Sequence, residues 1–157
     1  MNWKSGDILG CRIVPMRKFS DDRGWLTEIF RLDELDEDLH PAMGYVSETG
    51  PGVTRGPHEH EDQTDYFVFI AGAVTLFLWD DRTDSVSYGV RSVHQVGLKN
   101  PTMAVVPPGV VHAYRNDGPE PVLILNFPNR LYGGPARSEP VDEIRHEERE
   151  NSPFVMD

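Results

Sequence analysis

The sequence has 157 residues, which is enough for one domain with a hydrophobic core. Its 26 acidic and 15 basic residues give a net charge of −11, which argues against nucleic-acid binding, because that function needs a basic face. Hydrophobic residues make up 38% of the chain without any run near the ~20 apolar residues of a membrane-spanning helix, so we expect a folded domain with no membrane contact.

Short strand candidates follow one another along the chain, separated by Gly, Pro, Asn and Asp. The stretches DYFVFI and VTLFLWD are the clearest strands, because aromatic and β-branched residues dominate both. Both are apolar on their two faces, as expected of strands between a filled interior and a second layer or a partner subunit. We expect strands at 11–18, 24–31, 44–48, 65–71, 74–80, 92–96, 103–106, 111–116 and 121–127. Helical patterns occur only at 33–39 and after residue 139.

Two histidines stand one residue apart in GVTRGPHEHEDQTDYFVFIAG. Written as a spacing, this stretch is G-x5-H-x-H-x4-D-x6-G, from Gly52 through His58, His60 and Asp65 to Gly72. Residues two apart point to the same face of an extended strand, so both imidazoles would share one face. Such a pair can hold a metal, move a proton, or simply be exposed.

A third histidine, His112, lies in PPGVVHAYRN, which has the spacing P-x-G-x2-H-x3-N. The two stretches resemble, in the same order, the two motifs of the cupin superfamily. The resemblance implies a jelly-roll β-barrel of the cupin type, in which the two motifs face each other inside one barrel. It would bring together four side chains, namely His58, His60, Asp65 and His112.

Three imidazoles and a carboxylate suit Fe(II), Mn(II), Ni(II) or Zn(II) by ligand type. The metal-binding cupins usually have glutamate where this chain has Asp65, whose side chain is one methylene shorter. The same four residues could also line a polar cavity without metal. The residues alone leave a divalent transition metal possible and do not require one.

Further segments are similar to one family within this superfamily, the dTDP-4-dehydrorhamnose 3,5-epimerases, which are metal-independent enzymes of deoxysugar synthesis. FSDDRGWLTEIF resembles the family's F-x-D-x-R-G-x-x-x-E-x-F, and GVTRGPH resembles its G-V-x-R-G-x-H. WDDR, VPPGVVHAY and the region 129–146 also resemble family segments in the same order. The resemblance covers residues 19–148 and implies a nucleotide-sugar epimerase or isomerase without a cofactor.

The resemblance also implies roles for single residues. His58 matches the base that removes a proton next to the keto group, and His112 matches a second histidine of the pocket. Arg23 and Arg55 match arginines that contact the nucleotide diphosphate or the sugar, and Glu28 matches an acid that contacts the nucleotide. These residue types suit the chemistry, because imidazole titrates near neutrality and arginine pairs well with phosphate.

The chain also departs from the family's pattern. Asp65 stands where the family has a lysine that stabilises the enolate, and His60 stands where glutamine is common. We therefore count Asp65 among the catalytic candidates and His60 among the substrate-binding ones. The family's catalytic tyrosine aligns near Asn126, and the nearest phenol is Tyr132.

The carboxylate that orients the base in the family matches Glu147 or Glu148 by position. The histidines His40, His94 and His146 carry no motif, and we expect all three to be exposed.

We predict one cupin domain over residues 1–157, with a barrel core at about 10–130 and a helical or irregular C-terminal extension at 131–157. The leading function is proton abstraction next to the keto group of a dTDP-4-keto-6-deoxysugar. One alternative is a metal-dependent dioxygenase or isomerase that uses His58, His60, Asp65 and His112. Another is a sugar-binding cupin without catalytic activity.

Two expectations concern the surroundings of the protein. Apolar residues on both faces of the central strands favour a homodimer. The single Cys11 and the absence of an apolar segment in MNWKSGDILG favour the cytoplasm.

Overall fold

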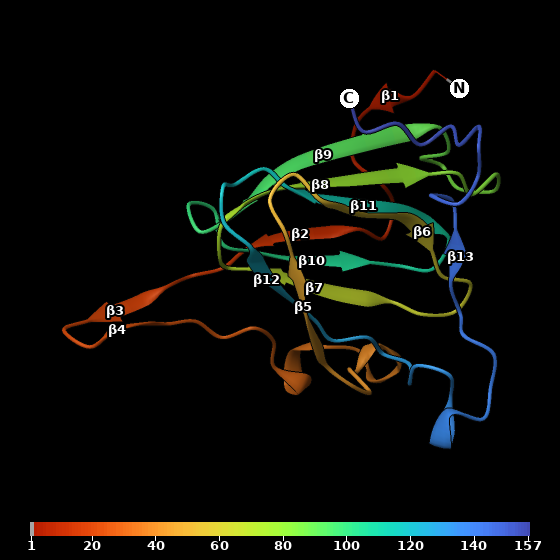
Figure 1. The fold of residues 1–157 in the computed structure, drawn as a ribbon. Helices are drawn as coiled ribbons and strands as arrows, with labels where there is room; N and C mark the ends of the chain where they lie inside the picture. Colours follow the sequence, from red (N-terminus) through yellow and green to blue (C-terminus); the bar gives the residue numbers. More distant parts are fainter. Residues whose placement is uncertain (1) are drawn as a thin grey trace.

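The computed structural model describes residues 2–157 and consists mainly of two β-sheets that face each other (Figure 1). The first sheet has the order β1-β9-β8-β11-β6-β13 and the second β2-β10-β7-β12-β5. The strands of the first sheet are β1 (Lys4–Ser5), β9 (Val90–Gly97), β8 (Ala73–Asp80), β11 (Val110–Asn116), β6 (Thr54–Glu59) and β13 (Ile144–Arg145). The strands of the second are β2 (Arg12–Pro15), β10 (Thr102–Val106), β7 (Asp65–Phe69), β12 (Val122–Asn126) and β5 (Tyr45–Thr49). This is the expected all-β barrel of the cupin type.

The space between the sheets is filled by apolar side chains from both. Phe67 and Phe69 of β7 meet Leu76 and Leu78 of β8, and all four are almost fully buried. Ile124 of β12 belongs to the same core. The prediction that the two clearest strands supply the core is therefore confirmed.

The outer faces of both sheets are covered by other segments of the same chain. Phe77 and Trp79, on the outer face of β8, pack against Trp3 and Phe154 near the two chain ends. The outer side of β7 and β10 packs against the segment 29–39, which includes Ile29 and Phe30. The apolar character of both strand faces therefore does not require a partner subunit.

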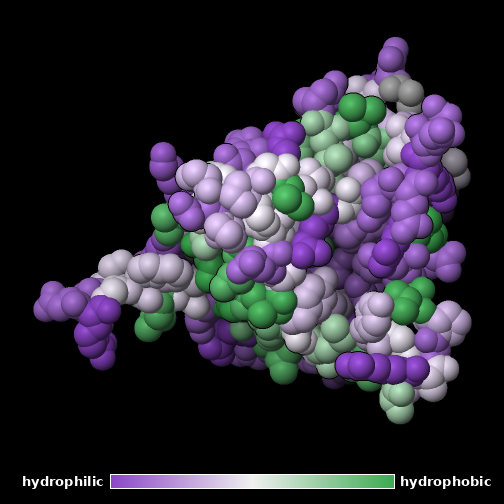
Figure 2. All heavy atoms as spheres, viewed as in Figure 1, coloured by the Kyte–Doolittle hydropathy of each residue, from purple (hydrophilic) through white to green (hydrophobic). Residues whose placement is uncertain are grey.

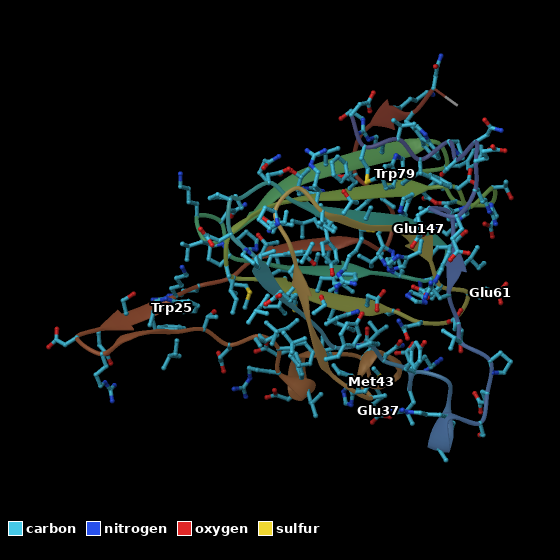
Figure 3. All side chains as sticks on the ribbon, viewed as in Figure 1. Trp25, Glu37, Met43, Glu61, Trp79 and Glu147 are labelled. Atoms are coloured by element: carbon cyan, nitrogen blue, oxygen red, sulfur yellow. The ribbon has the colours of Figure 1, made fainter. Side chains whose placement is uncertain are left out.

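Two strands project from the barrel as an arm. β3 (Phe19–Asp21) and β4 (Gly24–Leu26) pair only with each other among the described strands, and Figure 1 shows them extending away from both sheets. Trp25 lies on this arm in Figure 3. In Figure 2 the tip of the arm is hydrophilic, whereas hydrophobic residues lie closer to the body.

The irregular segments differ from the sequence-based expectations. The pattern at 33–39 forms two short 3-10 turns, η1 (Leu32–Glu34) and η2 (Glu37–Leu39). The helical expectation after residue 139 is wrong, because this part of the chain adds strand β13 to the edge of β6. A third 3-10 turn, η3 (Pro135–Arg137), precedes it.

Two strand expectations also need correction. The strand expected at 24–31 ends at Leu26, where the arm returns to the barrel. β6, with the sequence TRGPHE, is absent from the expected strand ranges, although the histidine pair was expected on an extended strand. No helix within residues 2–157 has the length and apolar character needed to cross a membrane.

The core predicts a sharp contrast between two neighbouring residues of β12. Ile124 is 1% exposed, whereas Leu123 is 52% exposed. Ile124→Ala should lower the free energy of unfolding by about 2–5 kcal/mol, because it leaves a cavity between the sheets. Leu123→Ala should change it by less than about 0.5 kcal/mol. Urea denaturation at a fixed protein concentration measures both, and equal losses would contradict the assigned inward face of β12.

Candidate active site

A cavity of about 1140 Å³ opens at one end of the barrel. It is lined by residues of both sheets and by the C-terminal segment, which runs past the opening before it joins β6 as β13. Figure 3 places Glu61 and Glu147 beside β6 and β13, with Met43 below them, and all three line this cavity. The volume is large enough to hold a small-molecule ligand.

Strand pairing brings the first two histidines together. β6 and β11 are antiparallel neighbours, and His58 stands directly opposite His112 in their register. The two ring centroids are 4.4 Å apart. Gly56 permits this approach, because a Cβ at that position would lie 2.5 Å from the His112 carbonyl oxygen and its φ is +82°.

Asp65 reaches the histidines from the opposite sheet, at the start of β7. Its side chain is 1% exposed, and its two carboxylate oxygens have different surroundings. Oδ1 accepts hydrogen bonds from the amide groups of Gln63 and Asn126, both at 2.8 Å. Oδ2 has no hydrogen-bond donor and lies 3.2 Å from His60 Nε2 and 3.4 Å from His112 Nε2.

The tautomers of His60 and His112 follow from the contacts of their Nδ1 atoms. Nδ1 of His112 contacts the Val110 carbonyl oxygen at 3.0 Å, and Nδ1 of His60 contacts the carbonyl oxygen of Asp142. A carbonyl oxygen only accepts, so each Nδ1 must carry a proton. In the neutral rings, both Nε2 atoms therefore present a lone pair to the same carboxylate oxygen.

Charges and burial act in opposite directions on these groups. Burial alone would raise the pKa of Asp65, but contacts with His112 and His60 hold it well below its usual range. Burial alone would lower the pKa of His60, but the Asp65 carboxylate raises it above its ordinary value. Burial, followed by the neighbouring His112 and His60, lowers the pKa of His58 to about 2, which keeps its ring neutral.

The orienting carboxylate expected for His58 does not contact it in this structure. Nδ1 of His58 is buried and has no hydrogen-bond partner within residues 2–157. Glu147 lines the cavity, and Glu148 pairs with Arg145 at 3.5 Å. The expectation that His146 is exposed is wrong, because it is buried. Its Nε2 lies 2.7 Å from the Glu59 carboxylate.

The predicted substrate-binding arginines occupy different places. Arg55 lines the cavity and donates to Thr49 Oγ1 and to the Glu48 carbonyl oxygen. No carboxylate among residues 2–157 forms an ion pair with it, so its charge is available to a ligand. Arg23, in contrast, lies at the exposed arm and pairs with Asp21.

Glu28 lies just beyond the arm and is 3.5 Å from Arg31. Neither Arg23 nor Glu28 lines the cavity of its own chain.

Tyr45 is a candidate functional residue that the sequence motifs do not identify. It lies on β5, lines the cavity, and its hydroxyl accepts a hydrogen bond from Asn126 Nδ2 at 3.0 Å. Burial raises the pKa of Tyr45 to about 12, so the phenol keeps its proton. A phenol thus stands beside Asn126, the position that aligns with the family's tyrosine. Alternation along the expected strand 44–48, which puts Tyr45 and Ser47 on one face, is the signal that could have found it.

The C-terminal segment is fastened to the loop after β6 by Asp142. Its carboxylate accepts hydrogen bonds from the backbone N–H groups of Glu61, Asp62 and Gln63, at 2.7 to 2.9 Å. Its carbonyl oxygen accepts the Nδ1 proton of His60. One residue thus holds both the loop and the ring orientation of His60.

This attachment predicts a local effect of Asp142→Ala. The variant should raise the hydrogen-exchange rates of the amides at 61–63, because their acceptor is lost, while the barrel strands keep their protection. Exchange measured by NMR tests this, with the exposed Glu148→Ala as the matched control. Unchanged protection at 61–63 in Asp142→Ala would contradict the assigned role.

Comparison with known proteins adds to this geometry. Residues 5–125 match the family model of dTDP-4-dehydrorhamnose 3,5-epimerase. A Haloferax volcanii protein named as a probable low-salt glycan biosynthesis epimerase is 39% identical over 114 residues, which cover 72% of this chain and 73% of that one. The spore coat polysaccharide biosynthesis protein SpsL of Bacillus subtilis is 37% identical over 126 residues, 80% of this chain and 82% of SpsL.

Solved structures share the fold at lower identity. A dTDP sugar isomerase from Desulfovibrio desulfuricans has a TM-score of 0.78 and 21% identity, covering 94% of this chain and 89% of its own. A 3'-monoepimerase from Streptomyces bikiniensis, in complex with dTDP-quinovose, has a TM-score of 0.76 and 22% identity, covering 90% and 71%. Together with the family match over most of the barrel, these likenesses show that the chain belongs to the dTDP-4-dehydrorhamnose 3,5-epimerase family, a family of epimerases with the cupin fold.

Proposed function

We propose that this protein epimerises a nucleotide-linked 4-keto-6-deoxysugar, most simply a dTDP-4-keto-6-deoxysugar, by removing a proton from a carbon next to the keto group. The observation that carries the proposal is the position of His58, an imidazole opposite His112 at a cavity that also presents an unpaired arginine. The two curated relatives are named for glycan and polysaccharide biosynthesis, which agrees with a role in making a sugar precursor. We place the protein in the cytoplasm, because its one cysteine is a free thiol.

The cavity offers a base and an acid from opposite sheets. His58 comes from β6 in the first sheet, and Tyr45 comes from β5 in the second. Inversion of a carbon centre requires a proton to leave one face and return to the other. We assign proton removal to His58 and proton return to the protonated phenol of Tyr45.

Arginine side chains at the cavity suit the diphosphate of such a substrate. Arg55 and Arg137 both line the cavity, and neither forms an ion pair with a carboxylate in the described chain. On a protein with a net charge of −11, two arginines with unpaired charge mark a local site for an anion.

The two alternative functions are less well supported. A metal-dependent dioxygenase or non-sugar isomerase does not fit membership in a family of dTDP-sugar epimerases. A binding protein without activity was suggested by the missing family tyrosine, but Tyr45 supplies a phenol at the same place. The epimerase therefore accounts for more of the cavity than either alternative.

The proposal predicts that solvent deuterium enters the sugar. With dTDP-4-keto-6-deoxyglucose in D₂O, NMR should show exchange at C3 or C5, and His58→Asn should slow it about 10²–10⁴-fold. His94→Ala, a histidine outside this cavity, is the matched control and should exchange at the wild-type rate. Absence of exchange in the wild-type protein, with measurable binding of the nucleotide sugar, would contradict the epimerase and favour a binding protein.

A second variant separates the two proton transfers. Tyr45→Phe should still allow exchange on the His58 side but should form little of the inverted sugar, because the acid on the other face is missing. Chromatography of the products beside the deuterium measurement gives both rates. Equal loss of exchange and inversion in Tyr45→Phe would remove the assigned role of the phenol.

We also propose that the protein is a homodimer in which the arm contacts a second copy. A two-stranded hairpin without further packing is at best marginally stable in water, yet the arm carries Phe19, Trp25 and Leu26 in exposed positions. Neither Arg23 nor Glu28 lines the cavity of its own chain, so a role in substrate binding requires the cavity of a partner chain.

This proposal predicts an assembly that depends on the arm. Light scattering should give twice the mass of one 17.8 kDa chain, and the double substitution Trp25→Ala and Leu26→Ala should shift the protein towards the monomer. The control is Val86→Ala, which changes an exposed residue outside the arm. A monomeric wild-type protein, or a dimer that the arm substitutions leave unchanged, would contradict the proposal.

A further inference from the structure

Asp65 Oδ2 lies in an electrostatically unfavourable environment beside His60 and His112. It is a buried carboxylate oxygen without a hydrogen-bond donor, and two imidazole Nε2 atoms lie within 3.4 Å of it. Because His60 and His112 use their Nδ1 protons on backbone carbonyl oxygens, the neutral rings turn lone pairs towards a negative oxygen. Such an arrangement requires a positive charge among the three atoms.

We propose that a divalent transition-metal cation binds among His60 Nε2, Asp65 Oδ2 and His112 Nε2. Two imidazoles and a carboxylate form a donor set that Zn(II), Co(II), Ni(II), Mn(II) and Fe(II) accept. Two atoms that bind one such ion at about 2.1 Å lie about 3.0 to 3.4 Å apart in octahedral or tetrahedral geometry. The observed separations of 3.2 and 3.4 Å match this spacing.

The surroundings of the three donors suit a metal site. The backbone carbonyls of Asp142 and Val110 fix the rings in the tautomer that leaves Nε2 free, as the outer contacts of ligating histidines commonly do. Asn126 and Gln63 hold Asp65 through Oδ1 and leave Oδ2 for the ion. The Gln63 amide nitrogen also lies 3.2 Å from His60 Nε2, so it can serve that lone pair while the ion is absent.

We assign His58 to proton removal and leave it out of this set of three ligands, although its ring belongs to the same histidine cluster. One ring nitrogen from each of His58, His60 and His112 lies within 4.8 Å of the other two, which places His58 next to the ion. His58 therefore remains available as the base, and the cation would stand beside the carbon that it deprotonates. A bound divalent cation would supply positive charge for an oxygen that becomes negative in the reaction.

Asp65 and a bound divalent cation would together carry the same net charge as the lysine that the family has at this position. One carboxylate and one divalent cation together carry a charge of +1. The lysine that the family has at this position carries the same charge. The place of the ion rests on the contacts alone, whereas its part in the reaction rests on the proposed function.

The test measures metal binding without substrate. Untagged protein is treated with EDTA, dialysed and titrated with Co(II) and Zn(II), with calorimetry for both ions and visible absorption for Co(II). We expect one equivalent per chain and absorption bands of cobalt bound to nitrogen and oxygen. Asp65→Asn keeps the size of the side chain but removes the charge of a ligand. Loss of a residue that only hydrogen-bonds to a ligand weakens metal binding about 10–100-fold, so Asp65→Asn should weaken it at least as much.

Two controls make the result decisive. His94→Ala removes a histidine outside the site and should bind as the wild type does, and circular dichroism checks that Asp65→Asn remains folded. Binding that is absent, or that Asp65→Asn leaves unchanged, would overturn the metal site. Deuterium exchange that persists in EDTA with no metal bound would overturn the part of the ion in the reaction while the epimerase proposal stands. Metal binding without exchange would leave the site intact and refute the epimerase.

Discussion

The site depends on the burial of one carboxylate, Asp65, between two β-sheets. One of its oxygens is fully satisfied by the amides of Gln63 and Asn126, and the other faces two imidazoles. A buried charge is costly unless it is paired, so the neighbours of Asp65 must supply positive charge. The protonation or metal binding of the two histidines follows from this requirement.

The barrel brings these groups together from strands far apart in sequence. The register of β6 and β11 sets His58 opposite His112, and Asp65 begins the strand that faces them from the other sheet. Asn126 of β12 then links Asp65 to Tyr45 of β5 through its amide. A single chain of hydrogen bonds thus connects the carboxylate to the phenol that we assign as the acid. The same packing that closes the core aligns the candidate base and acid.

Most of the fold could be predicted from the sequence, because alternating and aromatic strands such as those around Phe67 and Phe77 carry strong local signals. The convergence of His58, His60, Asp65 and His112 could be predicted only through the spacing of two known motifs. Tyr45 could be found only from the alternation along the expected strand 44–48, whereas Asp142 could not be predicted, since it acts through a contact with a residue 82 positions away. The buried His146 was missed for the same reason, because its partner Glu59 lies 87 residues earlier. The arm was only partly predicted. The expected strand 24–31 includes β4, but no strand was expected at the position of β3.

The most direct measurement of how Asp65 is neutralised is the ¹⁵N spectrum of the imidazole rings. Our account predicts that His60 and His112 carry their protons on Nδ1, and that one equivalent of Zn(II) shifts both Nε2 signals. In Asp65→Asn the same addition should leave these signals in place. A His60 ring protonated on both nitrogens at neutral pH, with no response to Zn(II), would contradict the account and assign the positive charge to a proton.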